Sequence, residues 1–210
     1  MPCATKDWDT AEDNPYIAEQ LAYDPTDEEC LAEEHVSKLN AEQLSAFNAA
    51  YLSVCDNSGK QFFVDGPGGT GKTFLYKALC HCVRGNGWIA LCVASSGIAA
   101  LLLPGSRTAH STFSIPVQGL ADDSSCQIDK GSKQANMLHQ VRLIIWDEAP
   151  MQHRYVCTSW SLSGVLLNFF LSSAMLLRPS NALSETSGQT IVPLGVSPSS
   201  LEVTFNKHFL

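Results

Sequence analysis

Basic residues are scarce in this 210-residue chain, which has 13 lysines and arginines against 21 aspartates and glutamates and a formal net charge of −8. Such a balance disfavours a protein that binds nucleic acid by charge alone. The charge is unevenly distributed, however. Residues 1–36 hold 11 acidic residues and 1 basic one, a local balance of −10, whereas residues 37–155 hold 8 acidic and 10 basic ones, a balance of +2. The overall sign therefore reflects an acidic leader, and the middle of the chain is compatible with DNA contact.

The sequence also lacks the cysteine pairs that are typical of zinc sites. Its eight cysteines form no C-x-x-C pair, and Cys80 and Cys82 would point to nearly opposite faces of an expected helix, so they could not share a metal with His81. Reduced thiols in an intracellular protein are the favoured interpretation. The acidic N-terminus has no apolar run, so no secretory signal is predicted. We expect a nuclear protein, with the mitochondrion as the alternative compartment.

One stretch is rich in glycine. Gly66-Pro67-Gly68-Gly69-Thr70-Gly71-Lys72-Thr73 fits the phosphate-binding pattern G-x-x-x-x-G-K-[ST], in which glycines let successive backbone N–H groups point at phosphate oxygens. Lys72 can reach the β- and γ-phosphates, and the Thr73 hydroxyl can ligate Mg²⁺. Residues 61–65 before the loop predict a short buried strand, and residues 73–83 after it predict a helix whose N-terminal dipole faces the phosphates. The sequence thus predicts an ATP and Mg²⁺ site, against the alternative of a plain glycine-rich turn.

A second apolar strand, predicted over residues 141–146, runs directly into Asp147 and Glu148. Two carboxylates at the end of a buried strand are typical of the other half of a nucleotide site. We expect Asp147 to hold the magnesium ion and Glu148 to activate the attacking water. An apolar run that ends in Asp-Glu is weak evidence for a nucleotide site when it occurs alone, and strong evidence when it follows a phosphate loop.

Two further segments supply candidate binding residues. Asn40 is a good N-cap for a helix with Leu44, Phe47 and Tyr51 on one face, and the amide of Gln43 offers the donor and acceptor that adenine requires. Alternatively, Gln43 is an ordinary exposed helix residue.

The other segment, residues 107–113, combines hydroxyls, a cation and an aromatic ring, a composition suited to a single-stranded backbone with a stacked base. An equally plausible interpretation of residues 107–113 is a polar loop that caps a following helix. Apolar runs at residues 88–94 and 98–103 predict a buried strand and a short helix. Together these elements predict an α/β fold with a parallel sheet and helices on both faces.

These pieces resemble the petite-integration-frequency family of superfamily 1 DNA helicases, especially its Helitron-transposon-like branch. Four segments carry the resemblance in family order: Leu39-Asn40-Ala41-Glu42-Gln43, the loop at 66–73, Ser95-Ser96-Gly97-Ile98-Ala99-Ala100 extended through Arg107-Thr108-Ala109-His110-Ser111, and Ile144-Ile145-Trp146-Asp147-Glu148-Ala149-Pro150-Met151 continuing into His153-Arg154-Tyr155.

The resemblance implies a RecA-like domain and ATP-driven 5′-to-3′ translocation on single-stranded DNA, with work in DNA repair, recombination or telomere maintenance. It implies an adenine role for Gln43 and DNA contacts at the following residues: Ser96, Gly97, Thr108, His110, Ser111 and Phe113. The alternatives are a non-catalytic ATP- or DNA-binding remnant and an unrelated P-loop NTPase.

The expected organisation has three parts: an acidic leader over 1–36, an incomplete RecA-like domain over 37–155, and a tail over 156–210. The leader is expected to be flexible, with a helix around residues 28–36 as the alternative. The tail has only four charged residues in 55, namely Arg178, Glu185, Glu202 and Lys207. It shows no γ-phosphate sensor and no second motor domain, so the leading hypothesis is non-homologous sequence from a truncated or mis-spliced gene. The uncharged run 160–177 is a weak membrane-span candidate, and a short strand or helix that fills the sheet edge is the favoured alternative for it. We expect no stable membrane association. Without a second domain, the chain alone is expected to hydrolyse ATP slowly and not to unwind duplex DNA.

Overall fold

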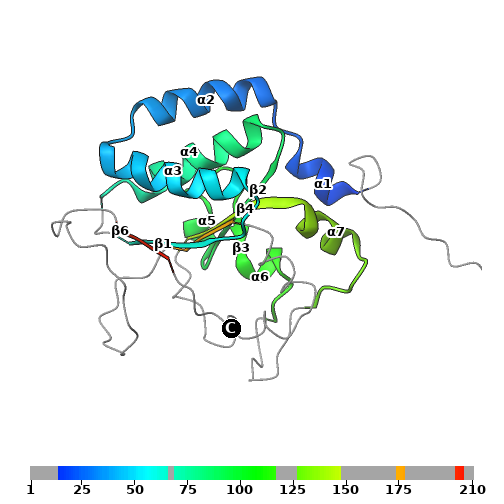
Figure 1. The fold of residues 1–210 in the computed structure, drawn as a ribbon. Helices are drawn as coiled ribbons and strands as arrows, with labels where there is room; N and C mark the ends of the chain where they lie inside the picture. Colours follow the sequence, from blue (N-terminus) through cyan, green and yellow to red (C-terminus); the bar gives the residue numbers. More distant parts are fainter. Residues whose placement is uncertain (1–13, 66–68, 117–126, 148–173, 178–201, 206–210) are drawn as a thin grey trace, which may run out of the picture.

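The computed structural model describes residues 14–65, 69–116, 127–147, 174–177 and 202–205. These residues form seven helices and six strands, shown in Figure 1. In chain order the elements are α1 (Pro15–Gln20), α2 (Pro25–Ser37), α3 (Ala41–Cys55), β1 (Gln61–Asp65), α4 (Lys72–Gly85), β2 (Ile89–Ala94), α5 (Gly97–Ala100), β3 (Arg107–Thr108), α6 (Ala109–Thr112), α7 (Lys133–Gln140), β4 (Val141–Asp147), β5 (Ala174–Leu177) and β6 (Glu202–Phe205).

The strands form one sheet in the order β3-β2-β4-β5-β1-β6. All neighbouring pairs are parallel except β1 and β6, which are antiparallel. The parallel α/β architecture predicted from the sequence is therefore confirmed, with one antiparallel strand at its edge. The strand that precedes the phosphate loop, β1, and the strand that ends in Asp147, β4, are separated by β5.

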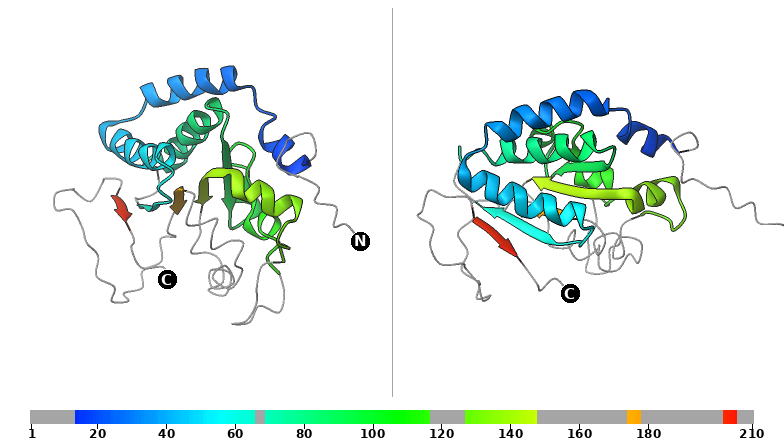
Figure 2. Two further views of the ribbon diagram at one scale, coloured as in Figure 1. Left: turned by 45° about the vertical axis from the view of Figure 1, so that its right-hand side comes forward. Right: turned by 45° about the horizontal axis from the view of Figure 1, so that its top comes forward.

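Each face of the sheet buries its own apolar core, because successive side chains of a strand point to opposite faces. On β2, Ile89, Leu91 and Val93 belong to one core, and Ala90 and Cys92 belong to the other. Helices α3 and α4 cover the second face, and side chains of α1, α6 and α7 fill the first. Figure 2 shows α7 and α1 on the side of the sheet away from α3.

The N-terminal residues 14–36 differ from the flexible leader that we predicted. Ile17 of α1 is buried in the first core, and α2 packs along α4 on the opposite face, with Ala32 buried (Figure 1). The acidic composition concealed this packing because only a few apolar side chains of the segment, among them Ile17 and Ala32, are buried, and others such as Leu21 and Leu31 are exposed. The predicted domain boundary at residue 37 therefore does not separate these helices from the sheet.

Two other predictions need correction. In α3, Phe47 is buried and Tyr51 stacks on it, but Leu44 is exposed, because the buried stripe runs through Gln43, Ala46, Ala50 and Val54 instead. In the tail, a strand filling the sheet edge was one expectation, yet β5 lies inside the sheet between β4 and β1, and only β6 is at the edge. Most of the span candidate 160–177 falls outside the described residues, and none of the described helices is long and apolar enough to cross a membrane.

Candidate functional site

The described part of the phosphate loop leads directly into α4. Gly69 and Gly71 both have left-handed backbone conformations, with φ of 83° and 81°. Gly71 is the N-cap of α4, and no described side chain caps this helix with a hydrogen bond. Lys72 is 5% exposed, and its Nζ lies 3.4 Å from Thr70 Oγ1. The N-terminus of a helix, its dipole and a buried ammonium together fit a phosphate group. Residues 66–68 of the predicted loop lie outside the described residues.

Gln43 lies against this loop. Its Nε2 donates to the Thr70 carbonyl (3.0 Å), and its Oε1 accepts from the Asn40 backbone N–H (3.0 Å), completing a capping box at the start of α3. A Cβ added at Gly71 would lie 2.5 Å from Gln43 Nε2, so the loop can approach the amide this closely only with glycine. Gln43 is 7% exposed, so it is not the ordinary exposed helix residue of the alternative interpretation. It supports the loop through its hydrogen bond to Thr70. The spacing Asn40-x-x-Gln43 is the sequence signal for the capping box, whereas no local pattern indicates the hydrogen bond from Gln43 to Thr70.

Asp147 is fully buried at the C-terminal end of β4. It pairs in register with Ala94, the last residue of β2, and its carbonyl accepts a hydrogen bond from the Ser95 N–H (3.2 Å). The phosphate loop follows β1, which is parallel to β4 through β5, so Asp147 and the loop lie at the same edge of the sheet. Carboxylate and hydroxyl oxygens suit Mg²⁺, and Asp147 and Thr73 are the described residues that would hold it. The predicted Glu148 lies outside the described residues.

The predicted DNA-contacting residues gather at this same edge. Thr108 pairs in register with Ala94, opposite Asp147 across β2. Ser96 and Thr108 are N-caps, accepting hydrogen bonds from the N–H groups of Ala99 (3.2 Å) and Ser111 (3.3 Å). These caps follow the helix-capping alternative that the sequence left open, and they do not exclude contact with a ligand. Gly97 and Ser111 are exposed and His110 is partly exposed.

Phe113 contradicts its predicted role as a base-stacking residue. Its side chain is fully buried in the first core, with its ring centroid 5.9 Å from that of Trp146. A ring without exposed area cannot stack on a base, so Phe113 packs α6 against β4. The Trp146 Nε1–H in turn donates to Ser95 Oγ (3.3 Å), which joins the end of β4 to the loop before α5. No sequence pattern marked this link between the two parts of the site.

The thiols of the α4 region lie behind the loop rather than in it. Cys80 and Cys92 are buried and hydrogen-bonded to each other, and this bond together with burial raises the pKa of Cys80 well above its ordinary value. Burial raises the pKa of the Cys82 thiol to about 11. Within the described ranges, no group of three or more His, Cys, Asp or Glu side chains could hold a metal ion.

A family model described as PIF1-like helicase matches residues 38–163 of the chain. Two curated relatives come from Trypanosoma brucei brucei. One, named ATP-dependent DNA helicase PIF4, is 31% identical over 98 residues, which cover 45% of this chain and 12% of the relative. The other, named ATP-dependent DNA helicase PIF1, is 34% identical over 90 residues, which cover 42% of this chain and 9% of the relative.

Solved structures show the same fold. Bacteroides Pif1 bound to single-stranded DNA matches with a TM-score of 0.53 and 22% identity, covering 67% of this chain and 32% of that one. Pif1 helicase from Candida albicans matches with a TM-score of 0.52 and 20% identity, with 67% and 32% coverage. The chain thus spans about a tenth of its curated relatives and a third of the solved ones. The family match extends past the predicted limit at residue 155 and covers more than half of the chain, which therefore belongs to the PIF1-like helicase family.

Proposed function

We propose that this chain is the ATP-binding motor domain of an ATP-dependent DNA helicase that couples ATP hydrolysis to movement along single-stranded DNA. The observation that carries the proposal is the placement of three features at one edge of the sheet: the N-terminus of α4 with the buried Lys72, the buried Asp147, and the exposed residues around Thr108. Strand β2 lies between the strand that ends in Asp147 and the strand that ends in Thr108, so it connects the proposed nucleotide site to the proposed DNA contacts.

In this proposal the backbone of the loop from Gly66 to Gly71 and the ammonium of Lys72 hold the ATP phosphates. Thr73 and Asp147 would hold Mg²⁺, and the bound ion would neutralise the negative charge that develops on the leaving group. Glu148 orients and deprotonates the attacking water. Gln43 keeps the loop in place through Thr70, and the second N–H and second lone pair of its amide remain available to adenine.

Single-stranded DNA is the proposed polymer ligand, with Ser96, Gly97, Thr108, His110 and Ser111 as contacts. The DNA bound to the Bacteroides structure supports this assignment by family likeness. The 5′-to-3′ direction and a place in repair, recombination or telomere maintenance belong to the same proposal and rest on the family resemblance. Phe113 is buried and therefore does not contact DNA in this proposal.

The test is the rate of ATP hydrolysis by the 210-residue chain with and without oligo-dT. We expect a slow basal rate that single-stranded DNA stimulates, and no unwinding in a strand-displacement assay. Glu148→Gln should abolish turnover and keep nucleotide binding, whereas Lys72→Ala should weaken binding of a fluorescent ATP analogue.

The outcomes separate the alternatives. Turnover that ignores DNA would favour an unrelated P-loop NTPase. Nucleotide binding with no turnover, and no effect of Glu148→Gln, would favour a non-catalytic remnant. ATP-dependent unwinding by this chain alone would contradict our expectation that a motor needs two bodies whose separation changes with the nucleotide.

A further inference from the structure

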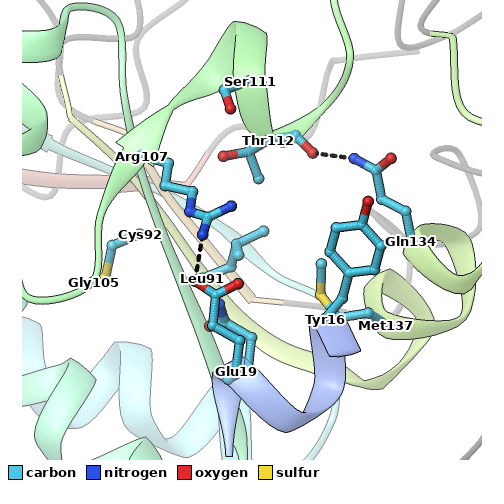
Figure 3. Close-up of a pocket in the computed structure, with 11 residues that line it drawn as sticks. Tyr16, Glu19, Leu91, Cys92, Gly105, Arg107, Ser111, Thr112, Gln134 and Met137 are labelled. Carbon is cyan, nitrogen blue, oxygen red and sulfur yellow. Dashed lines mark hydrogen bonds and ion pairs between the residues drawn. The ribbon is translucent and has the colours of Figure 1, made fainter. Parts of the chain in front are cut away.

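Helix α1 places an acidic side chain on the DNA-facing edge. Glu19, in the last turn of α1, forms an ion pair with Arg107 of β3, although the two residues are 88 positions apart in the chain. Figure 3 shows the carboxylate of Glu19 directed at the Arg107 guanidinium, with Ser111 and Thr112 beyond it. The two side chains are 49% and 53% exposed, so a ligand in solvent can reach both.

Arg107 occupies the position expected of a phosphate contact. It immediately precedes Thr108 and pairs with Val93 at the carboxyl end of β2, beside the residues proposed to contact DNA. A guanidinium binds a phosphate through two parallel hydrogen bonds, in the same way that it binds a carboxylate. A DNA phosphate and Glu19 would therefore compete for the same donors.

The ion pair does not by itself hold α1 in place. The helix is anchored by Ile17, which is 1% exposed in the first core, and by Asn14, whose side chain donates to the Lys133 carbonyl at 2.7 Å. The carboxylate of Glu19 is thus presented to Arg107 by packing that lies elsewhere. Because an exposed ion pair is weak, a phosphate can displace the carboxylate without unfolding α1.

We propose that Arg107 binds a phosphate of single-stranded DNA and that Glu19 competes for it, so that α1 lowers the affinity of the domain for DNA. This inference rests on the proposed function. Helix α1 lies outside the residues that match the family, 38–163, so the competitor is carried by a segment beyond the family match. The surrounding residues 1–36 hold 11 acidic residues and 1 basic one, which adds to the repulsion of a phosphate backbone at low salt.

The experiment measures binding of fluorescein-labelled oligo-dT to the full 210-residue chain by fluorescence anisotropy at several salt concentrations. Glu19→Gln keeps the size of the side chain and removes its charge. We expect it to tighten binding about two- to five-fold at low salt. The slope of log K against log salt should steepen by less than about 0.7, the value for one full phosphate contact on a single strand, because the wild-type chain already makes that contact part of the time. Arg107→Gln should weaken binding.

Two comparisons make the test specific. Glu33→Gln removes one exposed negative charge from α2, on the opposite face, and should change the affinity far less than Glu19→Gln. In the Arg107→Gln background, Glu19→Gln should have no further effect, because the competitor then has nothing to compete for. The urea unfolding midpoint of Glu19→Gln should stay at the wild-type value.

Equal gains from Glu19→Gln and Glu33→Gln, or a gain that persists without Arg107, would overturn the inference and leave the proposed function standing. So would wild-type DNA binding that Glu19→Gln does not change. If neither wild type nor Glu19→Gln binds oligo-dT, both the inference and the DNA part of the proposed function fall, whereas ATP binding is measured separately.

Discussion

At the scale of single residues, the phosphate loop depends on one close approach. The Gln43 amide holds the Thr70 carbonyl and the Asn40 N–H, and it lies where a side chain at position 71 would have to be. Gly71 is therefore required for two separate reasons, its left-handed backbone and the space that Gln43 occupies. Gly69 shares the first reason and not the second, since nothing lies within 4 Å of its added Cβ.

This pair of glycines makes a controlled prediction. Alanine at either position should cost about 1–2 kcal/mol for the left-handed conformation. Gly71→Ala should cost about 1 kcal/mol more, because it displaces Gln43 and breaks the hydrogen bond to Thr70. Urea unfolding of the two variants measures the difference. In a Gln43→Ala background the excess should disappear, and an excess that remains there would show that the amide is not its cause.

At the scale of elements, α2 is fastened to the helix that follows the phosphate loop. Glu28 Oε2 lies 2.7 Å from His81 Nδ1, and both residues are buried. The ring of His35 stacks on that of Phe74, with centroids 4.9 Å apart, one residue beyond Thr73. Through these contacts the N-terminal segment supports α4 over much of its length.

Removing one partner of the buried pair should be costly. Glu28→Ala leaves a buried ring nitrogen of His81 without its partner and should lower the free energy of unfolding by about 1–3 kcal/mol. Glu33→Ala, an exposed position on the same helix, should change it by no more than about 0.5 kcal/mol. Thermal or urea unfolding measures both. Similar changes from the two variants would show that the contact between Glu28 and His81 does not contribute measurably to stability.

At the scale of the whole molecule, the nucleotide site depends on residues that do not resemble the family. Strand β5 (Ala174–Leu177) pairs in parallel with β4 on one side and with β1 on the other, so it joins the strand of the phosphate loop to the strand of Asp147. Strand β6 (Glu202–Phe205) only extends the edge beyond β1.

Shortened chains test this difference. A chain ending at residue 163 retains every family-matched residue and lacks β5, and we expect it to lose cooperative unfolding and ATP-analogue binding, because a marginally stable domain cannot lose an internal strand. A chain ending at residue 201 lacks only β6 and should keep both. Circular dichroism during urea unfolding distinguishes them. Unchanged cooperativity in the shorter chain would show that β4 and β1 hold together without β5.

The sequence by itself determined the α/β fold, the strands predicted at residues 61–65 and 141–146, the helix after the loop and the family, because each depends on local pattern and spacing. Tertiary structure decided what local pattern does not encode. It buried Phe113 against Trp146, turned the acidic residues 14–36 into packed helices, placed β5 within the sheet and brought Glu19 to Arg107. Each of these contacts joins residues at least 31 positions apart, and which of several apolar or charged side chains meet across such a separation is set by the packing of the whole sheet.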